Sequence, residues 1–419
     1  MPATRPADAA LTLLRNADVY APAPLGRGHL LVGGGRVLWM GADLPSLPAA
    51  LAVDEVDVGG ARLIPGLIDG HAHLTGGGGE AGPHTRVPPV PLSRFTRAGV
   101  TTAVGVLGTD DLTRTPAEVV AAARGLEAEG MSAWCHTGGY HLPAVTLTGS
   151  VRGDIVYVDK IIGVGEVALS DHRSSQPTFA EVAKLGAEAH VAGLMTGKAG
   201  IVHLHMGDGP RGLVLVRRAL DETEIPARVW NPTHVNRRRA LFDEAVALAA
   251  RGCTIDVTAF PVEDGEDAWT ADEALVRYWA SGAPPERVTV SSDGGGCLPL
   301  FDADGRVARM EVGDAGALAD TLALLLARGV PLERAVAPFT ANVAALLRLA
   351  GKGVVAVGGD ADLVVLDERG RPRDVMARGR WHVRAGALVR RGTFEGGAPG
   401  ETAQRRAGRE ELVMARKLP

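Results

Sequence analysis

The chain has 419 residues, of which 46% are hydrophobic and 22% charged, a balance typical of a globular protein with a substantial core. Its net charge of -5 disfavours nucleic acid and anionic membrane surfaces as partners. The three cysteines have no CxxC spacing, and no stretch reaches the roughly 18 uninterrupted apolar residues of a membrane span. We therefore predict a cytoplasmic protein without disulfides, signal segment or membrane helix.

Both ends of the chain are predicted to form strands. Short β-type runs cover residues 11–14, 29–32, 36–40, 361–366 and 375–383. They predict one small β-sandwich domain built from both termini, over residues 1–61 and 352–395. Residues 396–419 are polar and charged, and we expect them to form a tail.

Apolar runs alternate with helix-like stretches between these ends. The apolar runs are residues 63–68, 100–107, 131–135, 161–169, 201–206, 227–230, 253–257 and 288–290. The helix-like stretches are residues 116–130, 178–194, 212–221, 238–252 and 272–282, with later helices after Thr321 and over residues 344–349. Eight strands alternating with helices predict an α/β fold, a (β/α)8 TIM-like barrel over residues 62–351.

Polar residues cluster at the carboxyl ends of the predicted barrel strands, where such barrels carry their chemistry. The first run leads into two histidines, and strand alternation places residues i and i+2 on one face, so both can hold one metal ion. The fifth run carries two candidates on one face, His203 and His205. The two histidines of the first run are His71 and His73, and the other polar groups at strand ends include Glu166, His234 and Asp293. Imidazole and carboxylate groups are the ligands expected for zinc-like ions.

Several further motifs occur in chain order with this cluster. They are PGLIDGHAH, GGGGEAGPHTR, VGVLGTD, TGGYH, SDHRS, HMGD, PTHVNR and SSDGGG. With them the sequence resembles the isoaspartyl dipeptidase family of the amidohydrolase superfamily, from about residue 60 to about residue 300. The resemblance implies a binuclear metal-dependent dipeptidase that hydrolyses the isopeptide bond of β-aspartyl dipeptides and releases aspartate and an amino acid. It also implies a homo-oligomer, an octamer in that family.

The resemblance implies two zinc ions per chain. The expected ligands are His71, His73 and Asp293 for the first ion, and His205 and His234 for the second. Many members of the superfamily bridge the two ions with a carboxylated lysine. Glu166 occupies that position here and offers two carboxylate oxygens that can reach both ions. Lys160, which lies near the entry of the same strand, is the competing candidate.

The expected nucleophile is a hydroxide shared by the two metal ions, because a metal lowers the pKa of bound water to about 7. Asp293 would take a proton from that water and pass it to the leaving amine, as general base and then general acid. Tyr140 would polarise the scissile carbonyl or stabilise the oxyanion. We expect Asp171 to support its neighbours or cap a loop rather than act as a catalyst.

A β-aspartyl dipeptide carries two carboxylates and one ammonium, and the sequence offers partners for all three. Arg173 and Arg237 are predicted to bind the carboxylates through their planar guanidinium groups. Glu80, which follows a Gly-rich loop, suits the ammonium, and Thr109 can add a hydroxyl contact. The family carries a substrate-binding serine where this chain has Cys297, so the role of this thiol is left open.

Two other classes of function fit parts of this pattern. One is another amidohydrolase, either a dihydropyrimidinase-like cyclic amidase or an N-acyl amino acid deacylase, whose site needs fewer carboxylate-binding groups. The other is a non-catalytic dihydropyrimidinase-like scaffold. The scaffold is disfavoured because such chains usually lose metal ligands, whereas every ligand position is filled here.

Overall fold

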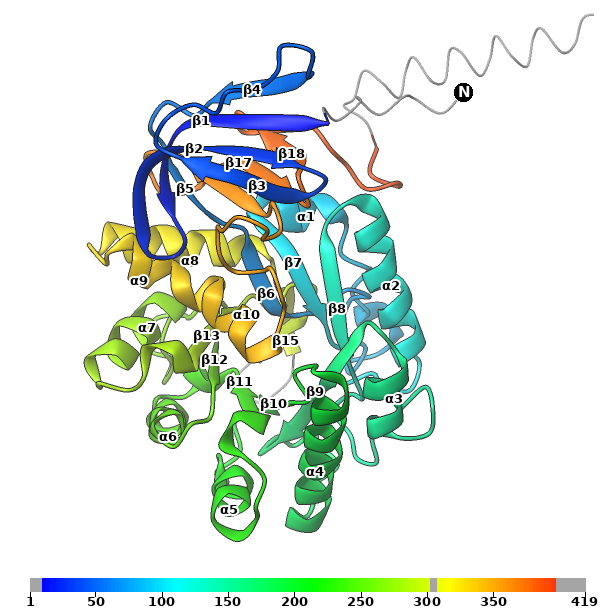
Figure 1. Ribbon diagram of the computed structural model, residues 1–419. Coiled ribbons are helices and arrows are strands. Elements are labelled where there is room, and N and C mark those ends of the chain that lie inside the picture. Colours follow the sequence, from blue (N-terminus) through cyan, green and yellow to red (C-terminus); the bar gives the residue numbers. More distant parts are fainter. Residues whose placement is uncertain (1–9, 302–306, 397–419) are drawn as a thin grey trace, which may run out of the picture.

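The computed structural model describes residues 10–301 and 307–396 of the chain. Figure 1 shows a barrel ringed by helices, with a separate sheet packed at one end. The tail predicted over residues 396–419 lies outside the described residues, apart from Gly396. No helix within the described ranges is both long and apolar enough to cross a membrane.

Parallel strands alternate with helices along the barrel, as the sequence predicts. The strands are β6 (Leu67–Ala72), β7 (Val100–Gly105), β8 (Ser132–Thr137), β9 (Ile161–Leu169), β10 (Val202–Met206), β11 (Trp230–Thr233), β12 (Ile255–Thr258) and β13 (Val288–Ser291). Strands β6 to β11 pair in chain order as one curled parallel sheet, and β12 pairs with β13. Since β12 lies beside β11 and β13 beside β6, the two pieces together form a TIM-like barrel.

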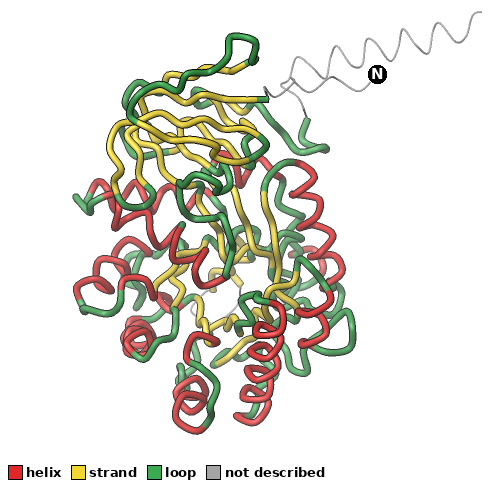
Figure 2. The backbone as a smooth tube through the Cα atoms, viewed as in Figure 1, coloured by secondary structure: helices red, strands yellow, loops and turns green. Residues whose placement is uncertain are grey.

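Helices cover the outside of this barrel (Figure 2). They are α1 (Leu92–Arg97), α2 (Pro116–Glu129), α3 (Val151–Tyr157), α4 (Phe179–Thr196), α5 (Val214–Glu222), α6 (Arg239–Ala250), α7 (Ala271–Ala280), α8 (Gly316–Ala327), α9 (Leu332–Val336) and α10 (Ala341–Leu347). Short 3-10 turns occur at Pro83–Thr85, Ala227–Val229, Val235–Arg237, Pro285–Arg287 and Ala337–Phe339. Helices α2 and α4 begin with capping boxes at Thr115 and Thr178, each stabilising its helix by about 1 kcal/mol.

The second sheet is mixed and takes strands from both ends of the chain. Its strands are β1 (Leu11–Tyr20), β2 (Pro24–Gly33), β3 (Arg36–Gly41), β4 (Val53–Asp57), β5 (Arg62–Pro65), β16 (Leu363–Leu366), β17 (Pro372–Ala377), β18 (Arg380–Arg384) and β19 (Ala387–Leu388). Strand β5 pairs antiparallel with β16, which joins the two ends. Leu14, Leu30, Leu63, Val365 and Met376 share its buried core. The predicted fold class, a TIM-like barrel with a small β domain built from both ends of the chain, is therefore confirmed. The strands of the β domain pair as one continuous sheet.

The apolar run over residues 63–68 was predicted as one barrel strand, and that prediction is wrong. The run breaks at Gly66, which packs so tightly on Thr101 that no Cβ would fit there. Gly66 N donates to Asp362 O, just before β16 of the terminal sheet, whereas Leu67 N donates to Gly99 O, just before β7 of the barrel. The run therefore serves both sheets, with β5 on one side of the glycine and β6 on the other.

Two other features differ from the sequence prediction. The run over residues 375–383 is a hairpin, β17 and β18, because the chain turns at Arg378 and Gly379. A further hairpin of β14 (Cys297–Phe301) and β15 (Val307–Val312) was not expected after the eighth barrel strand. It brings Cys297 and Glu311 to the wall of the cavity described below.

Candidate active site

The predicted metal ligands lie together at the carboxyl ends of the barrel strands. Glu166, on β9, is at the centre, and its side chain is almost fully buried. Its carboxylate lies 3.3 Å from His73 Nε2, 3.0 Å from His205 Nδ1, 3.4 Å from His234 Nε2 and 3.6 Å from His71 Nε2. One carboxylate therefore faces all four imidazoles, as a bridging ligand must.

Asp293 closes the other side of this group. It follows β13, and its Oδ1 atom lies 3.1 Å from His73 Nε2 and 3.4 Å from His71 Nε2. Two sets of atoms are close enough to share a metal ion, and both include His71. One set adds His73 and Asp293, and the other adds Glu166 and His234.

His205 belongs to neither of these sets within the described part of the chain. Its Nδ1 atom nevertheless lies 3.0 Å from Glu166 Oε2 and 2.8 Å from the hydroxyl of Tyr140. Its ring also lies against the ring of His234, with centroids 4.7 Å apart. The structure thus places His205 beside the Glu166 carboxylate, but it does not bring a third ligand atom of the described residues close enough to form a complete metal-binding set with His205.

Unpaired buried atoms test whether the site fits a metal. His71 Nε2 and Asp293 Oδ1 are buried without a hydrogen-bond partner among the described residues. Leaving such an atom unpaired costs about 1–3 kcal/mol, which a shared cation would offset. Burial alone would lower the pKa of His73, but the carboxylates of Asp293 and Glu166 raise that pKa to about 10. This demand for positive charge, together with the imidazole and carboxylate donors, fits divalent cations such as zinc.

Other side chains orient the imidazoles from behind. His71 Nδ1 lies 2.8 Å from His203 Nε2, and His203 Nδ1 lies 2.6 Å from Asn231 Oδ1. Since the amide oxygen can only accept, His203 Nδ1 donates to it, and His203 Nε2 accepts from His71 Nδ1. His71 therefore presents the lone pair of Nε2 to the site, and His203 is turned toward His71. His234 Nδ1 is held in the same way, 2.7 Å from Thr258 Oγ1.

Lys160, the competing bridging candidate, lies away from this cluster. It precedes β9, and its Nζ atom is 2.7 Å from Glu127 Oε2 and stacks over the ring of Trp134. Glu166 comes near the carboxyl end of the same strand. Of the two candidates, the structure brings only Glu166 to the imidazoles.

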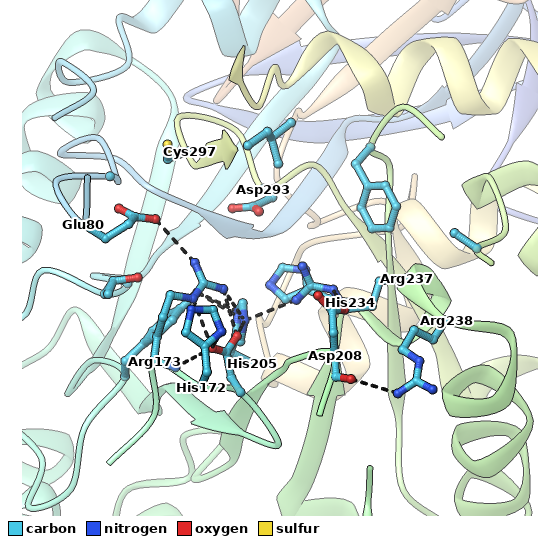
Figure 3. Close-up of a pocket in the computed structure, with 18 of the residues that line it drawn as sticks. Glu80, His172, Arg173, His205, Asp208, His234, Arg237, Arg238, Asp293 and Cys297 are labelled. Carbon is cyan, nitrogen blue, oxygen red and sulfur yellow. Dashed lines mark hydrogen bonds and ion pairs between the residues drawn. The ribbon is translucent and has the colours of Figure 1, made fainter. Parts of the chain in front are cut away.

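A cavity of about 660 Å³ opens over the cluster. Figure 3 shows Glu80 and Arg173 on one side of it, Arg237 on the other, and His205 and His234 between them. Every residue predicted to bind substrate lines this cavity: Glu80, Thr109, Tyr140, Arg173, Arg237 and Cys297. The outer wall adds residues that sequence reasoning did not single out, among them Asp208, Arg238, Phe260 and Glu266.

The two arginines are already held by the protein. Arg173 Nη2 and Nε donate to the carboxylate of Asp171 at 2.8 and 3.1 Å, while Nη1 reaches Glu80 at 3.4 Å. Arg237 Nη1 donates to Met206 O at 2.7 Å, and its Nε lies 3.1 Å from Asp208. Glu80 and Arg173 thus pair with each other, and a zwitterionic ligand would exchange that pair for its own charges.

Tyr140 is held where a hydroxyl can act on a bound ligand. Its backbone N donates to Gly108 O at 3.3 Å, and its carbonyl accepts from Ala168 N at 3.1 Å. Burial, reinforced by the charge of Glu166, raises the pKa of Tyr140 well above its ordinary value. The hydroxyl therefore stays protonated and can donate a hydrogen bond into the cavity.

Buried carboxylates behind the site were missed by sequence reasoning. Asp69 accepts from Ser292 N at 3.1 Å and from the Ser292 hydroxyl, which ties β6 to the loop that carries Asp293. Asp256 of β12 accepts from Thr233 and Ser291 of the neighbouring strands. The available signal was the position of Asp69 two residues before His71, which places both side chains on the same strand. That spacing does not show that Asp69 bonds Ser292.

Comparison with known proteins places this site in a family. Residues 62–382 match the model of the Amidohydrolase family. A crystal structure of a β-aspartyl dipeptidase from Fervidobacterium islandicum AW-1, in complex with β-Asp-Leu, shares 39% identity with this chain. The alignment covers 91% of this chain and 98% of that one, with a TM-score of 0.86.

Curated relatives carry a different name. An imidazolonepropionase from Ruegeria pomeroyi is 27% identical over 396 residues, covering 85% of this chain and 92% of the relative. Another, from Ralstonia nicotianae, is 40% identical over 110 residues, which span only 25% of its length. The family match covers most of the chain and includes all the predicted metal ligands described above. The protein therefore belongs to the amidohydrolase family.

Proposed function

We propose that the protein hydrolyses the isopeptide bond of β-aspartyl dipeptides and releases aspartate and an amino acid. The observation that carries the proposal is the arrangement of Glu80, Arg173 and Arg237 around the metal-facing cluster in one cavity. Two cations and one anion complement a substrate with two carboxylates and one ammonium. The similarity to a β-aspartyl dipeptidase crystallised with β-Asp-Leu supports the same assignment.

The residues that would hold two metal ions are His71, His73, Glu166, His205, His234 and Asp293. When bound, the metal would act as a Lewis acid and lower the pKa of water to about 7, so that hydroxide is available at neutral pH. Glu166 has the placement of a bridging ligand because its two oxygens face different imidazoles. Two predictions remain about the metal: that it is zinc, which these donors prefer, and that two ions are bound. Elemental analysis can check both.

Asp293 and Tyr140 would handle the proton and the carbonyl. The side chain of Asp293 is 14% exposed, so it reaches the cavity while Oδ1 faces the imidazoles. It can take the proton of the attacking water and deliver it to the leaving amine. Tyr140 can donate its hydroxyl proton in a hydrogen bond to the carbonyl oxygen as negative charge develops there.

Polar groups on the cavity wall would bind the rest of the dipeptide. Arg173 and Arg237 would take the two carboxylates and Glu80 the ammonium, each by a charge-assisted hydrogen bond. Thr109 and Cys297 line the same wall and can contact the aspartyl portion. A homo-oligomer and a cytoplasmic location stay predictions, which mass in solution and cell fractionation would check.

The direct test is turnover by the purified, zinc-loaded protein. We expect release of free aspartate from β-Asp-Leu, with much slower release from α-Asp-Leu, because the α-linked peptide carries its ammonium one bond closer to the scissile carbonyl and so away from Glu80. Absence of turnover for a panel of β-aspartyl dipeptides, at full metal content, would remove this proposal.

The second candidate is the imidazolonepropionase activity named for the curated relatives. It is favoured by the 27% identity that extends over 396 residues. A single-carboxylate substrate needs only one of the two arginines, so Arg237→Met separates the candidates. The dipeptidase proposal predicts a loss of about 10- to 100-fold in kcat/KM, corresponding to about 1.5–3 kcal/mol for a charged hydrogen bond. Turnover of imidazolonepropionate by wild type, little changed in Arg237→Met, would favour the second candidate.

A further inference from the structure

Asp171 is a buried carboxylate that bonds both a predicted metal ligand, His205, and a predicted substrate-binding residue, Arg173. It lies in the loop after β9, and only 4% of its side chain is exposed. Its Oδ2 atom lies 3.0 Å from His205 Nε2 and 2.8 Å from Arg173 Nη2. Its Oδ1 atom accepts from Arg173 Nε at 3.1 Å and from the backbone N of Arg173 at 2.7 Å. One side chain thus bonds both partners at once.

The contact with Asp171 decides which nitrogen of His205 faces the cluster. An ionised carboxylate only accepts hydrogen bonds, so His205 Nε2 carries the proton in its 3.0 Å contact with Asp171. This contact is shorter than those of the same nitrogen with Arg173 Nη2, at 3.4 Å, and with Arg237 Nη1, at 3.3 Å. The lone pair of Nδ1 then points toward Glu166 Oε2, 3.0 Å away, and toward the hydroxyl of Tyr140. A carboxylate behind a metal-binding imidazole fixes the ring and makes it a better ligand.

The same carboxylate fixes the guanidinium of Arg173. Two of its nitrogens, Nε and Nη2, are bonded to Asp171, so the plane of the group is set by that pair. The remaining edge, at Nη1, reaches Glu80 across the cavity at 3.4 Å. Arg173 therefore offers a defined edge to a ligand instead of sampling many rotamers.

The groups that support the other imidazoles differ from Asp171 in charge and in their position relative to the cavity. His203 behind His71 and Thr258 behind His234 are neutral, and neither lines the cavity. His73 Nδ1 has no partner among the described residues. Among the described contacts of these four rings, Asp171 is the support that also holds an arginine of the cavity wall.

We propose that Asp171 is a positioning residue that couples metal binding at His205 to recognition of a substrate carboxylate by Arg173. The inference rests on the proposed function, since it assigns both partners to that site. It makes the second metal position and the substrate carboxylate position depend on one side chain, so a change there disturbs both together.

The test compares zinc binding and dipeptide kinetics in the same variants. Asp171→Ala should weaken zinc binding at one of two sites by about 10- to 100-fold, measured by competition with a chromophoric chelator in the absence of substrate. Its KM for β-Asp-Leu, measured at saturating zinc, should rise about tenfold or more. Asp171→Asn keeps an acceptor for His205 and should recover part of the zinc affinity.

Two control variants separate the arms of the proposal. Asp208→Asn removes a carboxylate that pairs with Arg237 and that, among the contacts of the described residues, does not bond His205. Its zinc binding should therefore match wild type. Arg173→Met leaves the contact between Asp171 and His205 in place, so it should raise KM while both zinc sites keep their affinity. Circular dichroism melts confirm that each variant is folded, and Asp171→Asn stands in if the alanine variant is not.

Wild-type zinc affinity in folded Asp171→Ala would overturn the proposal. Weakened zinc binding with an unchanged KM would overturn the coupling, because Arg173 would then be independent of Asp171. If wild type fails to cleave β-Asp-Leu, the proposed function falls and the Arg173 arm falls with it. The zinc measurement uses no substrate, so it decides the His205 arm separately.

Discussion

Replacing Glu166 with glutamine is the sharpest perturbation of the cluster. The substitution keeps the size of a side chain that is almost fully buried, but it removes the negative charge and turns one oxygen into an amide nitrogen. That nitrogen cannot act as a ligand, so one face of the bridge is lost whichever way the amide is turned. The four surrounding imidazoles keep their places and supply no charge to replace it.

The size of the effect follows from the distances. The carboxylate oxygens of Glu166 lie 3.0–3.6 Å from the four ring nitrogens, so an ion bound by those nitrogens is a near neighbour of the carboxylate. Two unit charges about 4 Å apart interact by about 4 kcal/mol at an effective dielectric constant of about 20. A loss of about 4 kcal/mol corresponds to about 10³-fold in metal affinity. A divalent ion would lose more interaction energy than a unit charge, so about 10³-fold is a lower bound on the expected loss of metal affinity.

The assay measures zinc per chain after dialysis, and kcat/KM for β-Asp-Leu at a fixed zinc concentration. We expect Glu166→Gln to retain fewer ions than wild type and to lose at least 10³-fold in kcat/KM. Glu127→Gln is the matched control, since it removes a carboxylate that pairs with Lys160 away from the cluster. Full zinc content with wild-type kcat/KM in folded Glu166→Gln would refute the reasoning that this carboxylate bridges the ions.

Three further predictions concern the rest of the site. Thr258→Val removes the hydrogen-bond partner of His234 Nδ1 at nearly constant volume, and we expect zinc affinity to fall about 10-fold, measured by chelator competition. Prolonged dialysis against a strong chelator should abolish hydrolysis and lower the Tm, because bound metal stabilises only the folded chain; re-added zinc should restore both. Burial, with the charges of Glu80 and Asp293, raises the pKa of the Cys297 thiol to about 11. Its alkylation by iodoacetamide should therefore be slow at pH 8 and rise about tenfold per pH unit until about pH 11, with Cys297→Ala as the control; a rate independent of pH would contradict this.

The sequence alone predicts the barrel and the composition of its cluster because both follow local rules. Alternating strands and helices set the order of the barrel strands, and the carboxyl ends of parallel strands meet at one rim. Residues that follow strand ends far apart in the chain, such as His71 and Asp293, are thereby brought within 3.4 Å. Glu166 was separable from Lys160 by the same rule, since Lys160 precedes β9 and Glu166 lies toward the carboxyl end of that strand.

Tertiary contacts decided what the sequence could not predict. The period of a strand says that His203 and His205 share a face, but not that one ring turns toward His71 and the other toward Glu166. The link from Asp171 to His205 joins residues 34 positions apart through a hydrogen bond that exists only once the loop after β9 packs against the end of β10. The break at Gly66 likewise reflects competition between two sheets for one apolar run, which hydrophobicity alone cannot show.

The short reach of Glu166 gives a last prediction. A carboxylated lysine extends several bonds further from its backbone than glutamate, so a chain that uses glutamate must bring the strand nearer to the ions. Glycines on β9 set how closely it packs against β10, the strand that carries His205: a Cβ at Gly163 would lie 2.8 Å from Ile201 O, and one at Gly165 would lie 2.7 Å from His203 O. We therefore expect Glu166→Lys to stay inactive even with added bicarbonate, because a carboxylated lysine would overreach the imidazoles. Recovery of zinc content and hydrolysis in bicarbonate would show instead that β9 has room for the longer ligand, and that the glycines serve only the packing of β9 against β10.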